Sequence, residues 1–208
     1  MSDSCCQSPI DVSALQSRQR RILIIVLVVN AATFSMMVFA ATISGSSSLL
    51  SGALVNFGDA MTYALSLLVV AASGAAKARV ALFKGFLILA AALAVAYQIG
   101  WRILNPETPV FESMGIAALL NLAANSLCLW LLTPYREGDV NMSSAWECSR
   151  NDVSEGIAVI GAALAVWASE SGWPDLVIAI GLLALFLRSA ARVLRGAWQE
   201  LHSALPQN

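Results

Sequence analysis

Residues 45–68, GSSSLLSGALVNFGDAMTYALSLL, are apolar over the length of a membrane span and carry one carboxylate, Asp59, near their middle. A helix needs about twenty residues to cross the roughly 30 Å hydrocarbon layer of a bilayer. An ionised carboxylate at that depth costs about 2.5 to 3.5 kcal/mol on insertion scales, so it needs a partner or a function. The stretch predicts a spanning helix whose acidic side faces the inside of a bundle.

The rest of the chain has the composition of a membrane protein. Of its 208 residues 58% are hydrophobic and 12% are charged, and the mean hydropathy is +0.73. This is more apolar surface than a soluble core of that length hides. Six runs are long enough to span a bilayer: 22–43, 49–73, 82–104, 113–133, 143–168 and 175–194. The prediction is an all-α, polytopic membrane protein with six transmembrane helices over 22–194, between short tails at 1–21 and 195–208.

The positive charges predict the orientation. Of the twelve Lys and Arg residues, all except Arg102 fall on one side of the predicted spans. Cationic loops are retained in the cytoplasm, so both termini are expected there. The net charge of −1 provides no basic field for nucleic acid, which excludes that class of partner. The sequence contains no Ser-His-Asp or Cys-His set, phosphate-binding Gly motif or HExxH, so neither an enzyme nor a bound cofactor is expected.

Two predicted helices carry polar stripes. At 100° per residue, one face of the second span gathers Gly52, Asn56, Asp59, Tyr63 and Ser66. The spacing i, i+3, i+4, i+7 places on one face of the fifth span Cys148, Asn151, Asp152, Glu155 and Val159. Two such stripes predict a shared polar cavity. Asn30, Asn121 and Asn125 are interpreted as helix-packing residues, since amides often join helices by hydrogen bonds.

These stripes resemble the cation diffusion facilitator family, in which the second and fifth of six spans each carry a ligand followed four residues later by Asp. Residues 45–59 align without a gap to the family's run from a Gly-Ser turn to its aspartate. Residues 145–152, AWECSRND, align to the fifth-helix motif, and Trp173-Pro174-Asp175 resembles the start of the family's sixth span.

The resemblance implies a metal site. Asp59 and Asp152 occupy the aspartate positions, and Cys148 stands where the family usually has His or Asp. A cysteine ligates zinc as thiolate, and all four cysteines of this chain are interpreted as reduced thiols. Val55 departs from the pattern because it stands at the first ligand position and cannot bind a metal. Asn56 could supply an amide oxygen instead, or act only as hydrogen-bonding glue between helices.

The function implied is proton-coupled efflux of a divalent transition metal, Zn²⁺ or a similar ion such as Cd²⁺, Co²⁺ or Fe²⁺. Cys148 favours soft ions, whereas the additional carboxylate of Glu155 widens the choice toward iron or manganese. The alternative is a membrane metal sensor or partner subunit that does not transport, in which Val55 marks a degenerate site.

The resemblance also implies a setting and partners. A multi-pass protein of a bacterial inner membrane is expected, in contact with lipid, exchanging metal ions for protons and forming a homodimer. The chain is interpreted as a form without the soluble C-terminal domain found in many members. Cys5 and Cys6 could pass soft metal to the cavity, carry acyl groups or remain exposed thiols.

Overall fold

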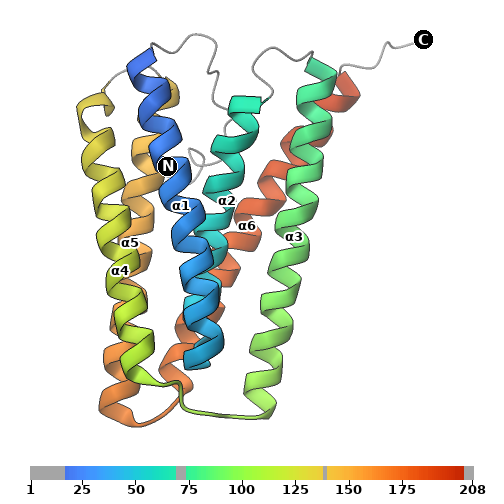
Figure 1. The fold of residues 1–208 in the computed structure, drawn as a ribbon. Coiled ribbons are helices and arrows are strands. Elements are labelled where there is room, and N and C mark those ends of the chain that lie inside the picture. Colours follow the sequence, from blue (N-terminus) through green and yellow to red (C-terminus); the bar gives the residue numbers. More distant parts are fainter. Residues whose placement is uncertain (1–16, 69–73, 138–139, 204–208) are drawn as a thin grey trace.

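The computed structural model describes residues 17–68, 74–137 and 140–203, and within them the long elements are all helices. In chain order these are α1 (Ser17–Ser44), α2 (Ser47–Leu68), α3 (Gly74–Leu104), α4 (Phe111–Leu132), α5 (Val140–Ser169) and α6 (Trp173–Ser203), with a 3-10 turn, η3 (Thr133–Tyr135), after α4. The helices run alternately up and down one bundle (Figure 1). The all-α, six-helix prediction is confirmed for the described part of the chain.

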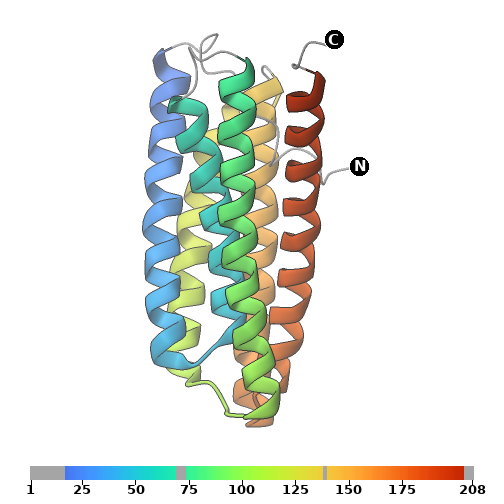
Figure 2. The same cartoon turned by 90° about the vertical axis from the view of Figure 1, so that its right-hand side faces the viewer.

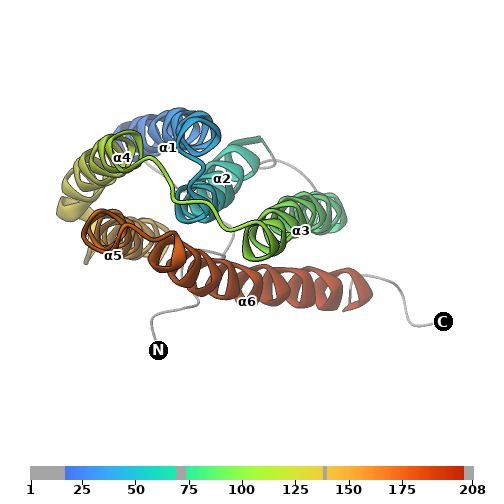
Figure 3. The ribbon, with the colours of Figure 1, turned by 90° about the horizontal axis from the view of Figure 1, so that it is seen from below.

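α2 lies at the centre of this bundle. It contacts α1 and α5 on one side and α3 and α6 on the other (Figure 3). The core has two main clusters, one shared by α1, α2, α4 and α5 and one shared by α2, α3 and α6. A polar residue on the inward face of α2 is therefore shielded from both lipid and water.

The outer surface is apolar, as expected of a bundle that faces lipid. Large hydrophobic side chains point outward along several helices, including Phe39, Trp101 and Trp130. By length and composition, four stretches in the described residues suffice to cross a membrane: Ser17–Ser44, Gly85–Leu104, Phe111–Tyr135 and Ala145–Ser169. α2 is not among these four stretches, because the polar stripe lowers its mean hydropathy, although α2 is the most central helix. The chain is a multi-pass membrane protein.

Some helices are longer than the predicted spans, because the helix continues beyond the apolar run. α3 begins at Gly74 instead of residue 82, and α6 continues past residue 194 to Ser203. Hydropathy detects only the apolar part of a helix, whereas the helix itself continues into the polar residues that flank that part. The N-terminal end of α1 and the C-terminal end of α6 lie at the same end of the bundle (Figure 2). That this end is cytoplasmic stays a prediction.

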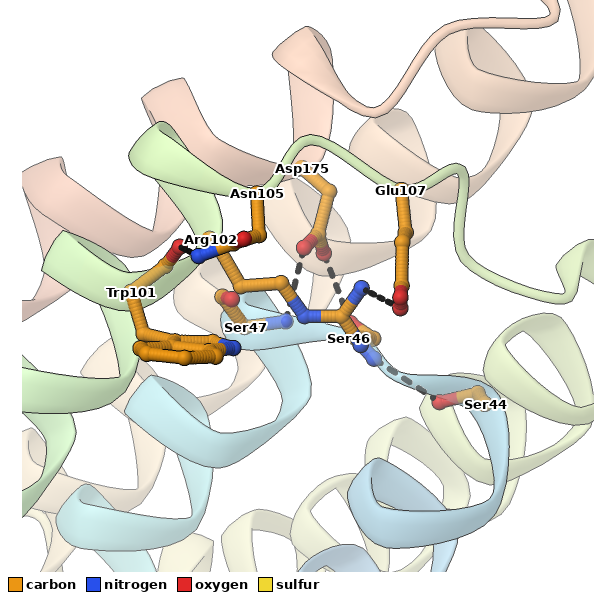
Figure 4. Close-up of polar contacts among 8 residues, drawn as sticks. All are labelled: Ser44, Ser46, Ser47, Trp101, Arg102, Asn105, Glu107 and Asp175. Atoms are coloured by element: carbon orange, nitrogen blue, oxygen red, sulfur yellow. Dashed lines mark hydrogen bonds and ion pairs between the residues drawn. The ribbon is translucent and has the colours of Figure 1, made fainter.

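At the opposite end, a buried aspartate joins α6 to the start of α2. Asp175 is 1% exposed and accepts hydrogen bonds from Ser46 Oγ at 2.6 Å and Ser47 N at 2.7 Å (Figure 4). It also accepts one from Ser48 N at 3.1 Å. The first N–H groups of a helix have no partner within the helix and carry partial positive charge, so a carboxylate there is favourable. We call Asp175 and Ser46–Ser48 the Asp175 clamp.

Arg102 covers the turn that leads into the clamp. Its guanidinium forms an ion pair with Glu107 at 2.7 Å (Figure 4). It also packs over Gly45, which has a positive φ of 70°. Any side chain at residue 45 would meet the guanidinium as well as strain the backbone. This explains why the first residue of the Gly-Ser turn, residue 45, is a glycine.

Replacing Asp175 by Ala is expected to lower the free energy of unfolding by about 1–3 kcal/mol, because the buried donors at the start of α2 lose their acceptor. Thermal unfolding of the purified protein in detergent measures the change. Glu112→Ala is the control, since Glu112 is an exposed acid in the first turn of α4. Equal melting temperatures for the two variants would contradict a stabilising role of the clamp.

Candidate metal centre

α2 and α5 bring two carboxyl groups into contact inside the bundle. Asp59 is 5% exposed and Asp152 is 4% exposed, and their side chains are hydrogen-bonded to each other. Ionised carboxylates only accept hydrogen bonds, so a contact between two buried carboxyl groups is favourable only with a proton or a cation between them. The two aspartates predicted from separate helices thus form one site.

A third acid extends the site along α5. Glu155 lies one turn beyond Asp152 and interacts electrostatically with both aspartates. The Oδ2 of Asp152 and the Oε2 of Glu155 are buried and have no hydrogen-bond partner within the described residues. Tyr63, from the same stripe of α2, is also buried beside the acids. The centre is consequently rich in oxygen acceptors that lack donors.

These acids line a small cavity between four helices. Its walls are Met37 from α1, Gly52, Val55 and Asn56 from α2, Asn121 and Asn125 from α4, and Asp152, Glu155, Gly156 and Val159 from α5. Gly52 keeps it open, because a Cβ there would stand 3.0 Å from Met37 Cε. The shared cavity inferred from the two polar stripes is present, and it includes side chains of α1 and α4 as well.

Asn56 belongs to a cluster of three amides on the cavity wall. Its Nδ2 donates to Asn121 Oδ1 at 2.9 Å and to Met37 Sδ at 3.2 Å, and its Oδ1 accepts from Asn125 Nδ2 at 3.4 Å. Asn125 Nδ2 also reaches Asn121 Oδ1 at 3.4 Å. We call Asn56, Asn121 and Asn125 the amide cluster. Ligation of a metal by Asn56 would compete with these hydrogen bonds.

Cys148 is buried at the position predicted for a ligand, but it is not a thiol. It is 4% exposed and forms a disulfide bond, whereas Cys128 is a free cysteine. The interpretation of Cys148 as reduced is therefore wrong in this structure, because a sulfur held in a disulfide cannot become a thiolate before reduction. Cys5 and Cys6, for which three roles were left open, lie outside the described residues.

Two further residues lie near the ligand motifs. Val55 is half-buried on the cavity wall, one turn before Asp59, where a ligand would face the acids. Arg150 is exposed and lies over the Trp146 ring at 5.2 Å from its centroid, away from the acidic centre. Within residues 17–68, 74–137 and 140–203, no three His, Cys, Asp or Glu side chains form a ready metal-binding group.

The interpretation of Asn121 and Asn125 as residues that join helices is confirmed by their hydrogen bonds to Asn56, but sequence reasoning missed that they also line the cavity. They lie one turn apart on α4, a helix outside the two ligand motifs, and both are buried. The i, i+4 spacing of two amides in an otherwise apolar span was an available signal, because it directs both to one face.

Comparison with known proteins identifies the family. The sequence family described as "Cation efflux transmembrane domain" matches residues 23–202, which is most of the chain. The chain belongs to the cation diffusion facilitator family. The resemblance stated from the α2 and α5 motifs is thereby confirmed, and the family is one of transporters of metal cations.

Two curated relatives of this cation diffusion facilitator are named as zinc transporters. "Zinc transporter ZitB" of Yersinia pestis is 28% identical over 136 residues, and the protein of the same name from Yersinia pseudotuberculosis serotype I (strain IP32953) is 27% identical over 136 residues. Each alignment covers 62% of this chain and 43% of the relative. The chain thus spans less than half the length of these relatives.

The paired acids predict a specific response to metal. Asp59→Asn and Asp152→Asn should each fold at least as stably as the wild type without metal, because an amide supplies a donor and removes a potential like charge. Neither variant should be stabilised by divalent metal. The wild type should gain about 2.7 kcal/mol at a metal concentration of about 100 times Kd.

Thermal unfolding with and without metal measures both effects. The control is Glu112→Gln, which should respond to metal as the wild type does. Metal-induced stabilisation that survives in both aspartate variants would exclude these carboxyl groups as ligands.

Proposed function

We propose that the protein exports a divalent transition-metal cation across a bacterial inner membrane in exchange for protons, with Asp59 and Asp152 as principal ligands. The observation that carries the proposal is the buried hydrogen bond between these two carboxyl groups. Family membership supports cation efflux, and the relatives' name makes Zn²⁺ the first ion to test.

The carboxyl pair provides a physical basis for proton coupling. The proton between Asp59 and Asp152 occupies lone pairs that a bound cation needs, so metal binding must release it. Protonation from the other side of the membrane would in turn expel the metal. Glu155 adds a further carboxyl group to the same cavity, and Cys148 becomes an additional soft ligand only in its reduced form.

A homodimer is proposed on the strength of family membership. Small residues on α5, among them Gly161, would allow two helices to approach closely, since a Cβ there meets no atom within 4 Å.

The second candidate function is a sensor or partner subunit that does not transport. It is favoured by Val55, which presents an apolar side chain where the family supplies a ligand. A site that binds metal without releasing it across the membrane would serve such a role.

Metal-driven proton flux separates these functions. Purified protein in proteoliposomes should alkalinise the lumen when Zn²⁺, Cd²⁺, Co²⁺, Fe²⁺, Mn²⁺ or Ni²⁺ is applied outside, because the metal that enters is exchanged for protons that leave. Asp59→Ala and Asp152→Ala should abolish the flux, because the shared ligands for metal and proton are gone. Glu112→Gln should leave it unchanged. Well-folded protein that gives no flux with any metal would favour the sensor or subunit.

Val55 offers a gain-of-function test. Val55→His places an imidazole one turn before Asp59 on the cavity wall, where it adds a nitrogen ligand of the kind zinc prefers. Zinc affinity, measured by competition with a fluorescent chelator, should rise by about tenfold or more, the range by which supporting groups change metal affinity. Val55→Leu is the size control. An unchanged affinity would mean that other side chains already complete the coordination shell.

A further inference from the structure

The amide cluster leaves one oxygen unused. Asn121 Oδ1 accepts from both Asn56 and Asn125, and Asn56 Oδ1 accepts from Asn125. Asn125 Oδ1 has no hydrogen-bond partner within the described residues, and the side chain is 2% exposed. Leaving a buried acceptor without a donor costs about 1–3 kcal/mol, so the position calls for a further group.

Asn125 is one of the residues that line the cavity containing the acids. Asn125 from α4 and Asp152 and Glu155 from α5 line the same space. Asp152 Oδ2 and Glu155 Oε2 likewise lack a donor within the described ranges. Three residues that each have an unpartnered oxygen therefore line one buried cavity. A cation in that cavity would be attracted by all three, because oxygen acceptors are the ligands of hard metal ions.

The donor set lacks the atoms that soft metals prefer. Of the polar side chains on the cavity wall, three are amides and two are carboxyl groups, and Met37 Sδ is already engaged by Asn56. Cys148 of the α5 motif is in a disulfide, and Cys128 on α4, a free thiol that interacts electrostatically with both aspartates, is not among the residues that line the cavity. Carboxylate and carbonyl oxygens suit harder ions such as Mn²⁺, whereas thiolates and imidazoles give zinc and cadmium their advantage.

We propose that Asn125 is a ligand of the transported cation, completing with Asp152 and Glu155 an oxygen-only subsite that shifts selectivity toward Mn²⁺ or Fe²⁺ and away from Cd²⁺. The proposal rests on the proposed function for its cargo and goes beyond it in two respects. It brings α4 into the site, and it assigns the coordination position left by Val55 to an amide on another helix.

The first test compares the binding of two metals. Mn²⁺ binding to the full chain in detergent is followed by the loss of the free-ion signal in electron paramagnetic resonance, and Cd²⁺ binding by competition. Asn125→Leu should weaken Mn²⁺ binding by about tenfold, as loss of one charge-assisted oxygen contact predicts, and change Cd²⁺ binding by less than about threefold. Glu155→Gln should likewise lower the affinity for Mn²⁺ relative to the affinity for Cd²⁺.

Asn121→Leu is the matched control. Asn121 lies one turn from Asn125 on the same helix and in the same amide cluster, but its Oδ1 already accepts two hydrogen bonds. A merely structural role of the cluster predicts equal losses for both metals and for both Asn variants. Ligation predicts a larger, metal-selective loss for Asn125→Leu. Asn125→His should reverse the preference toward Zn²⁺ and Cd²⁺, an effect that packing alone does not produce.

The outcomes distinguish this proposal from the function on which it rests. Flux that persists in liposomes while the Asn125 variants keep the wild-type ratio of Mn²⁺ to Cd²⁺ affinity would overturn the subsite and leave the exporter standing. A selective loss of Mn²⁺ binding without any flux would support the subsite and count against export. If Asn125→Leu does not give monodisperse protein, the ratios of Mn²⁺ to Cd²⁺ affinity in Asn125→His and Glu155→Gln decide whether the subsite exists.

Discussion

The contact between Asp59 and Asp152 is the constraint to which the rest of the bundle conforms. Two carboxyl groups can share a dry interior only when a proton or a cation lies between them, because two negative charges at that distance repel strongly in a medium of low dielectric constant. The arrangement therefore requires α2 and α5 to pack side by side with their polar stripes facing. It also requires α2 to be central, surrounded by helices that exclude lipid and water.

Much of this organisation is readable from the sequence, for physical reasons. Lipid tolerates few polar groups, so the hydropathy pattern locates the helices, and any acid inside a span is significant. Helical periodicity then predicts which residues share a face, and the burial of Gly52, Asn56, Asp59 and Tyr63 follows that prediction. The motifs on α2 and α5 sufficed to identify the family. Whether Asp59, Asp152, Cys148, Asn56 and Glu155 ligate metal stays a prediction.

What the sequence did not reveal depends on contacts between helices that carry no shared motif. Asn121 and Asn125 read as packing residues because a single helix does not show which neighbour its amides face. The disulfide at Cys148 was missed because pairing depends on the spatial approach of two cysteines, and spacing along the chain does not encode it. The full length of the helices was also not evident from hydropathy, because the predicted spans mark apolar runs and polar residues continue the helix past them, as in α6.

The Asp175 clamp has a mechanical consequence. It fastens the first turn of α2 to the start of α6 at one end of the bundle, so a motion of α2 that keeps these hydrogen bonds is a rotation about that end. Asp59 lies twelve residues further along the helix, roughly 18 Å from the pivot at 1.5 Å per residue. A tilt of about 10° would then carry its carboxyl group by roughly 3 Å, comparable to the length of a hydrogen bond. With its first turn held by the clamp, α2 needs only a small change of tilt angle to separate the carboxyl groups of the two aspartates.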